Sequence, residues 1–452
     1  MKFKKNLSRF TSFFLLIFSL FIFLYVFYRS EIIFNGSRNY NLYYALSIAL
    51  IILSTISFSI KIKIEHLIAS IILILGFYSM ELYLIYKKEY LDIKILKNKI
   101  EIYEKKNNQK FDIRTKKKIY KDIKNKNKNL SVTESWKFFL RFNDTNIFPL
   151  SGVSNVETIN CNENGFYSTY LSDRYGFNNI DTAWESKKVD YLLVGDSFVH
   201  GSCVNRPFDI ASQIIRLSNN QKNVISLGYA GNGPLAEYAT LKEYFPEAEV
   251  KNILWFYYEG NDLNDLDYEK KINFFLQYLK FDNHIQDFKN KNKKLKLDQY
   301  IQSKIDEVYL SFDSSRFIKL SSLRETIIPK KLDFLKNKDI NVSSSTKVTN
   351  ENLNLLKKVF YKAYKFSEDN NANFYIIILP DIDRYLSKNK KKYSINEVKA
   401  IARDLNIKFI DIDLEVFDKE INPKDLFPFK MEGHYNIKGY KKISDSIYNF
   451  IK

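Results

Sequence analysis

Four short polar clusters stand just after apolar runs or in the last loop of this chain, and their residue types together could perform nucleophilic catalysis. Ser197 lies in the sequence GDSF, Gly231 in GYAGNGP, Asn261 in EGND and His434 in EGHYN. A serine hydroxyl can attack a carbonyl carbon when a histidine takes its proton. Backbone N–H groups of a glycine-rich turn and a carboxamide can stabilise the oxyanion that forms. These residue types predict acyl chemistry at an ester.

Five short apolar runs would have to position these clusters. They are residues 190–194 (DYLLV), 223–227 (NVISL), 252–258 (NILWFYY), 373–379 (NFYIIIL) and 407–412 (IKFIDI). Continuous apolar runs separated by helix-sized connections indicate a parallel sheet that is buried on both faces. In such a sheet, ligands bind at the carboxyl ends of the strands. Ser197, Gly231 and Asn261 each follow a predicted strand, so we expect them at one edge.

Residues 131–452 have the composition of a globular α/β domain, and residues 264–350 form an excess within it. This excess lies between the third and fourth predicted strands and is rich in Lys, Asp and Ser. It indicates an insertion and not a further strand unit.

The ordered blocks GDSF, the glycine turn, EGND and GHYN resemble the SGNH (GDSL-type) hydrolases. The upstream sequence DRYGFNN, residues 173–179, resembles a turn found in that superfamily's polysaccharide-associated branches. The resemblance covers roughly residues 150–452. It implies a three-layer α/β/α sandwich, flavodoxin-like, with a five-stranded parallel sheet, which agrees with the five apolar runs.

The resemblance also implies roles for individual residues. Ser197 would be the nucleophile and His434 the general base, and the reaction would pass through an acyl-enzyme. The oxyanion hole would consist of the N–H groups of Ser197 and Gly231 and the side-chain amide of Asn261. It implies neither a cofactor nor a metal.

The third catalytic residue departs from the family's pattern. The family usually has an aspartate three residues before the histidine, whereas this chain has Met431 there. Glu432 is the nearest carboxylate, and we expect it to orient the imidazole. Asp425 is a more remote candidate, and a Ser–His dyad steered by a backbone carbonyl is the third alternative.

Three apolar stretches near the N-terminus have the length of membrane-spanning helices. They cover residues 10–28, 39–60 and 67–86, and only the third contains an acid, Glu81. About 20 apolar residues are needed to cross a bilayer. The sequence therefore predicts three transmembrane helices, with residues 1–88 as an anchor. Four basic residues before residue 10 favour a cytoplasmic N-terminus. The C-terminal domain would then be periplasmic, in a multi-pass protein of the inner membrane.

The positive charge is concentrated in one segment. The net charge is +18, and residues 87–130 hold 16 Lys/Arg against 6 Asp/Glu, which is +10 of it. Residues 89–130 are predicted to be a Lys-rich helical linker. A single basic tract is a weak footprint for nucleic acid, so we expect no nucleic-acid partner.

The chain has two cysteines, Cys161 and Cys203. A disulfide between them would tie the segment before residue 175 to the segment that follows Ser197. Two buried free thiols are the alternative, and the sequence does not choose between them.

The expected function is that of a membrane-anchored serine esterase that removes O-acyl groups, in particular acetyl groups, from a cell-envelope or extracellular glycan. The expected partners are the acylated glycan and the membrane, through residues 10–86. One alternative is an O-acyltransferase that acts on the same glycans, with a membrane protein as acyl donor. The other is a catalytically silent SGNH domain that binds polysaccharide.

Overall fold

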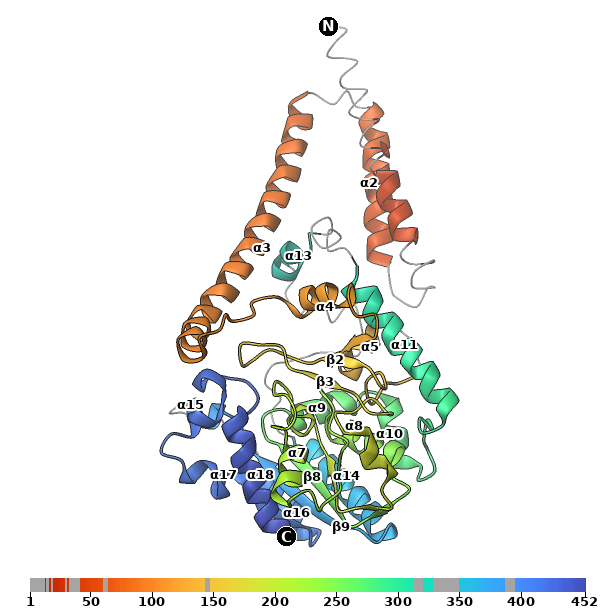
Figure 1. Ribbon diagram of the computed structural model, residues 1–452. Coiled ribbons are helices and arrows are strands. Elements are labelled where there is room, and N and C mark those ends of the chain that lie inside the picture. Colours follow the sequence, from red (N-terminus) through yellow and green to blue (C-terminus); the bar gives the residue numbers. More distant parts are fainter. Residues whose placement is uncertain are drawn as a thin grey trace. The chain divides into compact units, whose positions relative to one another are not determined.

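The computed structural model describes residues 13, 16–17, 19–28, 31, 41–59, 64–142, 147–311, 320–327, 349–386 and 395–452. The chain divides into two compact units (Figure 1). The first comprises Met1–Ile95 and Phe312–Asn341. The second comprises Leu96–Ser311 and Val342–Lys452. All the predicted catalytic residues belong to the second unit.

The prediction of three transmembrane helices is wrong. Within the residues that the structure describes, no helix combines the length and the apolar character that crossing a membrane requires. The second predicted span is helix α2 (Asn41–Ser59), and the third is part of α3 (Ile64–Asn107). The first span lies partly outside the described residues. The inner-membrane location was predicted from these spans and is wrong for the same reason, and a membrane partner through residues 10–86 is not shown.

A polar contact in the first unit gives part of the physical reason. Helix α3 does not end at Tyr86 but continues into the lysine-rich segment. Its Glu81 is fully buried and accepts hydrogen bonds from the N–H groups of Ser322 and Leu323, at 2.9 and 2.6 Å. These residues belong to the first turn of α13 (Ser321–Ile327). A carboxylate at a helix N-terminus satisfies donors that have no partner within the helix.

The second unit contains the predicted five-stranded parallel sheet. Its strands are β5 (Tyr191–Val194), β6 (Val224–Ser226), β8 (Asn252–Tyr258), β9 (Asn373–Leu379) and β10 (Lys408–Asp411). Their order in the sheet is β10-β9-β8-β5-β6, and every neighbouring pair is parallel. Numbered in chain order, this is 2-1-3-4-5, the flavodoxin-like arrangement. The predicted α/β class and the five parallel strands are confirmed.

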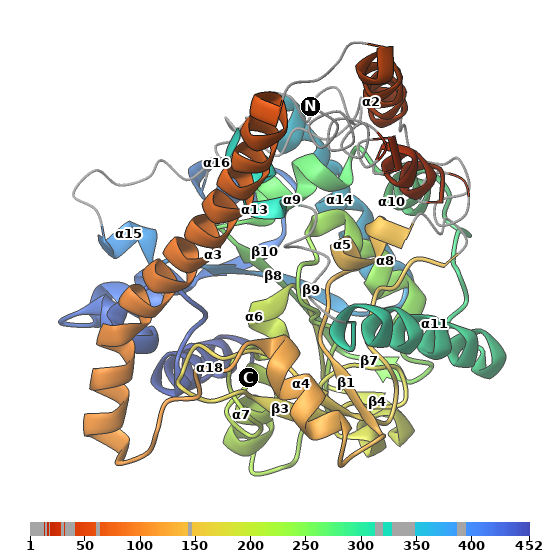
Figure 2. The same ribbon diagram turned by 90° about the horizontal axis from the view of Figure 1, so that it is seen from above.

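Alternate residues of the strands face two separate apolar cores. In β8, Ile253, Trp255 and Tyr257 face one core, and Leu254 and Phe256 face the other. Each core is formed with its own set of helices, whose arrangement around the sheet can be followed in Figure 1 and, from above, in Figure 2. The first core includes residues of α8 (Pro234–Tyr244), α14 (Asn350–Asp369) and α16 (Ile395–Asp404), and the second residues of α7 (Ile210–Leu217) and α18 (Ile437–Ile451). The sheet is therefore the middle of three layers.

A second, smaller sheet adds a loop that becomes important at the site. It consists of β1 (Leu130–Val132), β2 (Glu157–Ile159) and β3 (Thr169–Leu171), with β1 parallel and β3 antiparallel to β2. The connection from β2 to β3, residues 160–168, is called the acid loop below. Strands β4 (Lys188–Val189) and β7 (Glu249–Val250) form a separate parallel pair.

Further α-helices belong to the second unit. They are α4 (Lys116–Lys124), α5 (Trp136–Phe139), α6 (Ser197–His200), α9 (Asp262–Glu269), α10 (Asn273–Lys280), α11 (Lys291–Tyr309), α15 (Asp383–Leu386) and α17 (Ile412–Glu415). The buried Tyr120 of α4 donates a hydrogen bond to Asp306 of α11. Residues 116–124, which were predicted to be part of a linker, therefore pack against the globular unit.

The turn at residues 173–179 is hydrogen-bonded to β6, the strand at one edge of the five-stranded sheet. The Asn179 side chain donates to Ser226 O at 2.9 Å and accepts from Ser226 N at 2.8 Å, as a neighbouring strand would. It also donates to Asp173 Oδ2 at 2.8 Å. Asn179 is 5% exposed, so water cannot readily replace these partners.

We expect Asn179→Ala to lower the free energy of unfolding by about 3 kcal/mol, because it leaves a buried N–H and a buried C=O of Ser226 without partners. Arg174→Ala is the control. Arg174 forms ion pairs with Asp181 and Glu185, which are more exposed than Asn179. Its loss should lower the free energy of unfolding by less than about 1 kcal/mol. Urea unfolding followed by tryptophan fluorescence measures both, and equal losses would contradict the assignment.

Candidate active site

Ser197 is the first residue of α6 and follows the carboxyl end of β5 after a two-residue turn. The side chain of Asp196 caps the helix by accepting a hydrogen bond from Phe198 N at 2.9 Å. Ser197 itself is half-buried. N–H groups in the first turn of a helix have no partner within the helix, so that of Ser197 can serve a ligand.

His434 stands at the N-terminal side of α18, and its ring contacts Ser197. Nε2 lies 2.8 Å from Ser197 Oγ. The segment is held by its two following residues. Tyr435 donates to Pro380 O at 2.7 Å, and the Asn436 side chain donates to Asp425 O and Phe427 O while it caps Gly439 N. These contacts hold the segment that carries the imidazole, and none of them involves the acid loop.

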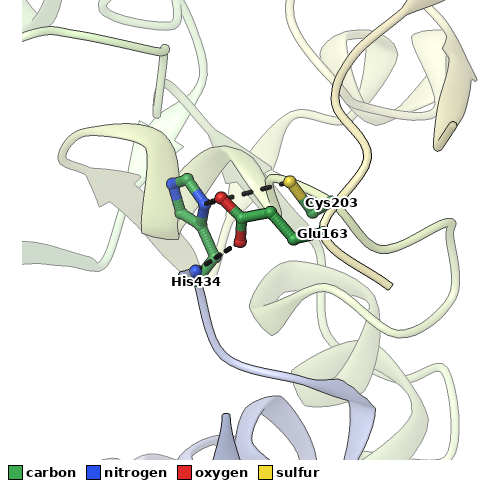
Figure 3. Close-up of side chains that lie close together, drawn as sticks. All are labelled: Glu163, Cys203 and His434. Atoms are coloured by element: carbon green, nitrogen blue, oxygen red, sulfur yellow. Dashed lines mark hydrogen bonds and ion pairs between the residues drawn. The ribbon is translucent and has the colours of Figure 1, made fainter. Parts of the chain in front are cut away.

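The carboxylate beside His434 is Glu163, not Glu432 (Figure 3). Glu163 Oε1 lies 3.0 Å from His434 Nδ1, and Oε2 accepts a hydrogen bond from His434 N at 2.5 Å. Glu432 is exposed. Asp425 forms an ion pair with Lys430 at 2.8 Å. The expectations for Glu432, for Asp425 and for a dyad without a carboxylate are therefore not met.

Glu163 was missed because it lies 271 residues before His434, outside the motifs of the family. The usual acid comes from the histidine loop itself, whereas Glu163 comes from the acid loop of the small sheet. The one sequence signal near it is Cys161, two residues earlier.

Opposing effects set the charges of this pair. Burial by itself would lower the pKa of His434, but the carboxylate of Glu163 and its hydrogen bond more than offset this and raise the pKa above its ordinary value. Burial would raise the pKa of Glu163, but the charge of His434 and the hydrogen bonds from its side chain and backbone lower it. The pair therefore favours an ionised glutamate, which stabilises the imidazolium.

Cys161 and Cys203 form a disulfide. It joins the acid loop to the segment just after α6, and Asn164 Nδ2 donates to Cys203 O at 2.9 Å beside it. Cys203 Sγ lies 3.9 Å from His434 Nδ1, so Glu163, Cys203 and His434 bring three ligand-type atoms together. A metal would need a thiolate, whereas this sulfur is bonded to Cys161.

The predicted oxyanion donors lie on loops at the same end of the sheet. Asn261 precedes α9, and its Nδ2 is 3.4 Å from Oδ2 of Asp196, the neighbour of Ser197. The loop that contains Gly231 is tied to the nucleophile's turn by a hydrogen bond from Tyr229 N to Gly195 O, at 3.3 Å. Gly231 has φ +77°, and a Cβ there would lie 2.6 Å from Ser135 Cβ. Only glycine fits this position without strain.

Other motif residues brace these loops. Glu259 of EGND accepts hydrogen bonds from the Arg384 guanidinium and from Asp381 N, which links the ends of β8 and β9. His200 is buried against the rings of Tyr170 and Tyr229. Burial lowers the pKa of His200 to about 3, so it remains neutral and is not a second base.

Comparisons with known proteins bear on the fold. No family model matches the chain, and no curated protein matches it. An acetyl xylan esterase structure matches 58% of this chain and 100% of its own, with a TM-score of 0.34 and 11% identity. A structure assigned to the lipolytic G-D-S-L family, from Desulfitobacterium hafniense, matches 58% and 99%, with a TM-score of 0.30 and 14% identity. A psychrotrophic esterase from Pseudoalteromonas matches 58% and 96%, with a TM-score of 0.28 and 12% identity.

The five-stranded parallel sheet and its strand order agree with the fold that the resemblance to the SGNH (GDSL-type) hydrolases implies. The roles of the site residues remain a proposal, which depends on the geometry described above.

We expect Glu163→Gln to slow covalent labelling of Ser197 by a fluorophosphonate by a factor on the order of 10³, because the amide no longer stabilises the imidazolium. Glu432→Gln is the matched control, since Glu432 is exposed and two residues from the histidine; its labelling rate should match that of the natural chain. Intact-mass spectrometry over time measures the rates. A large loss at Glu432 with none at Glu163 would reverse the assignment.

The pH dependence of labelling should report the raised pKa of His434. The imidazole acts as a base only when neutral, so the rate should fall as the pH drops through a pKa above the ordinary value. In Glu163→Gln the raising interaction is lost while burial remains, so the midpoint should move to lower pH. An unchanged midpoint would show that Glu163 does not act on the base.

Proposed function

We propose that the second unit is a serine-dependent ester hydrolase that removes O-acyl groups, in particular acetyl groups, from a glycan. The observation that carries the proposal is the imidazole of His434, which bridges Ser197 Oγ and the Glu163 carboxylate. This is the order of contacts that activates a serine hydroxyl.

The reaction proceeds in two halves. Ser197 Oγ attacks the ester carbonyl while His434 Nε2 takes its proton. As the tetrahedral intermediate collapses, the imidazolium protonates the leaving ester oxygen, which departs as the sugar hydroxyl and leaves an acyl-enzyme. In the second half, His434 takes a proton from the water that attacks the acyl carbon. The imidazolium then returns this proton to Ser197 Oγ as the acyl–Oγ bond breaks and the carboxylic acid is released. Glu163 holds the tautomer with a proton on Nδ1 throughout.

The oxyanion of each tetrahedral intermediate is stabilised by the N–H groups of Ser197 and Gly231 and by the amide of Asn261. Asn261 is half-buried, and its Nδ2 lies 3.4 Å from Asp196 Oδ2, which takes one N–H of the amide and leaves the other for a ligand. Such preorganised donors act on charge that exists only during the reaction. The contact between the Glu163 carboxylate and His434 favours catalysis over a catalytically silent domain that binds polysaccharide.

A groove lined in part by the acid loop and by the segment after His434 supports a glycan with negative charges as the acyl carrier. It has a volume of about 920 Å³, and its lining includes Asn164, which follows Glu163, and Asn436, two residues after His434. Four aromatic rings and four lysines line it, against one acid: Tyr103, Phe166, Phe427, Phe429, Lys106, Lys430, Lys438, Lys441 and Asp425. Aromatic faces provide apolar surface for sugar rings, and the excess of lysines attracts acidic groups.

Hydrolysis of p-nitrophenyl acetate by the full chain tests the activity. Ser197→Ala should abolish turnover, and Asn261→Ala should lower kcat by a factor on the order of 10²–10³, because one oxyanion donor is lost. Circular dichroism checks that both variants fold. A natural chain that is folded but neither hydrolyses this ester nor is labelled at Ser197 would exclude the proposal.

Release of acetate from an O-acetylated polysaccharide that contains uronic acids, compared with a neutral O-acetylated xylan, tests the carrier. The double variant Lys106→Glu/Lys441→Glu should raise KM for the acidic polymer by a factor on the order of 10, with less effect at high salt. Its kinetics on xylan should change little. Equal effects on both polymers would remove the argument for an acidic glycan, and the products distinguish free acetate from transfer to another sugar.

A further inference from the structure

The carboxylate of the triad is carried by a loop that a disulfide joins to the nucleophile's segment. Glu163 is two residues after Cys161, and Cys203 is six residues after Ser197. We propose that the Cys161–Cys203 disulfide is the element that positions Glu163 against His434, and that a dithiol, by cleaving it, leaves a weaker Ser–His pair. This inference rests on the proposed hydrolase function, because its main readout is turnover.

The acid loop is outside the parallel sheet that places the other catalytic residues. Ser197 follows β5, and His434 precedes α18, which packs on the same core as α7. Glu163 instead belongs to the connection between β2 and β3, two strands of three residues each. The strands themselves are anchored in the first core by Leu130, Val132 and Ile159, whereas Glu163 lies in the connection beyond them. A covalent link between the loop and the segment after α6 therefore has a positional role.

Apart from the disulfide and Glu163, the acid loop is held by hydrogen bonds, including one from the Tyr167 hydroxyl to Arg114 O at 2.9 Å, and by packing of the Tyr167 ring against the first core. Asn164 Nδ2 donates to Cys203 O at 2.9 Å, and Asn162 Nδ2 donates to Asp112 O at 2.7 Å. Gly165 O accepts from Asp112 N at 2.8 Å. Hydrogen bonds like these exchange with bonds to water and add little net stability each. The Glu163 side chain is 27% exposed, so water can reach it once the loop moves.

The segment of His434 has anchors apart from the disulfide. Tyr435 and Asn436 bind Pro380 O and the backbone of residues 425–427, away from the acid loop, in addition to the bond from His434 N to Glu163. Met431 occupies the position of the usual aspartate, and Glu432 is exposed. Among the described residues, the other group beside Nδ1 is Cys203 Sγ, at 3.9 Å. A thiol there does not replace the negative charge of Glu163 on the imidazolium.

A dithiol reagent supplies the electrons and protons that reduce the Cys161–Cys203 disulfide. A dithiol such as dithiothreitol attacks one sulfur as its thiolate, the S–S bond breaks, and a mixed disulfide forms. The second thiol of the reagent then closes a cyclic disulfide. The reagent gives up two electrons and two protons, and Cys161 and Cys203 become thiols. Since the chain has two cysteines, and both are in this bond, the reagent has one target.

The experiment compares p-nitrophenyl acetate hydrolysis by the full chain before and after dithiothreitol, with Cys161→Ser/Cys203→Ser as a variant that cannot respond. We expect reduction to lower kcat at least 30-fold, with KM within twofold. The double variant should equal the reduced natural chain, with or without the reagent. Glu432→Gln, as a matched control, should remain fully active and fully sensitive to reduction.

A double-mutant cycle separates positioning from a general structural role. Glu163→Gln should cost a factor on the order of 10³ in the oxidised chain but less than threefold in the Cys161→Ser/Cys203→Ser background, because the carboxylate is already displaced there. The midpoint of the pH profile should also move to lower pH on reduction, as it does in Glu163→Gln.

Each outcome decides between the alternatives. Unchanged turnover after complete reduction, confirmed by mass, would overturn the inference, and so would an equal cost of Glu163→Gln in both backgrounds. Loss of the far-UV circular dichroism on reduction would overturn it as well, since the disulfide would then stabilise the whole unit. Absence of turnover in the oxidised natural chain would instead disprove the proposed function.

Discussion

The two contacts of the His434 ring are the constraint on which the rest of the site depends. One nitrogen is 2.8 Å from Ser197 Oγ and the other is 3.0 Å from Glu163 Oε1. Both contacts require three segments, from three distant parts of the sequence, to meet within a few ångströms. The parallel sheet supplies the first segment, the final helix supplies the second, and the small sheet supplies the third.

Burial of side chains on both faces fixes the strands of the large sheet. Its strands place alternate side chains into two apolar cores, so a shift of one residue would exchange the two faces. This fixes where each strand ends and therefore where Ser197, Gly231 and Asn261 begin. Buried polar braces add to it: Asn179 substitutes for a strand partner of Ser226, and Glu259 binds Arg384 across the ends of β8 and β9.

The parts of this architecture that sequence could predict are those with local signals. Five apolar runs predicted the strands of the parallel sheet, motifs at the ends of three of them indicated Ser197, Gly231 and Asn261, and a motif before the last helix indicated His434. Glu163 had no such signal, because its role arises from a contact over 271 residues and from a loop outside the family's motifs. The apolar composition near the N-terminus also led to a wrong prediction, that of transmembrane helices. Apolar residues at 39–60 and 67–86 satisfied a length criterion, whereas the structure has a helix that continues through the lysine-rich segment and a buried Glu81 that caps another helix.

The small sheet also determines where the catalytic unit can be cut. A boundary at residue 131, as the change in composition suggests, falls inside β1 (Leu130–Val132) and removes its pairing with β2 at Leu130. It also removes Asp112, whose backbone exchanges hydrogen bonds with Asn162 and Gly165 of the acid loop. Tyr120, whose hydroxyl contacts Asp306, is lost too. A fragment for expression that keeps every one of these contacts begins at Leu96, the first residue of the second compact unit.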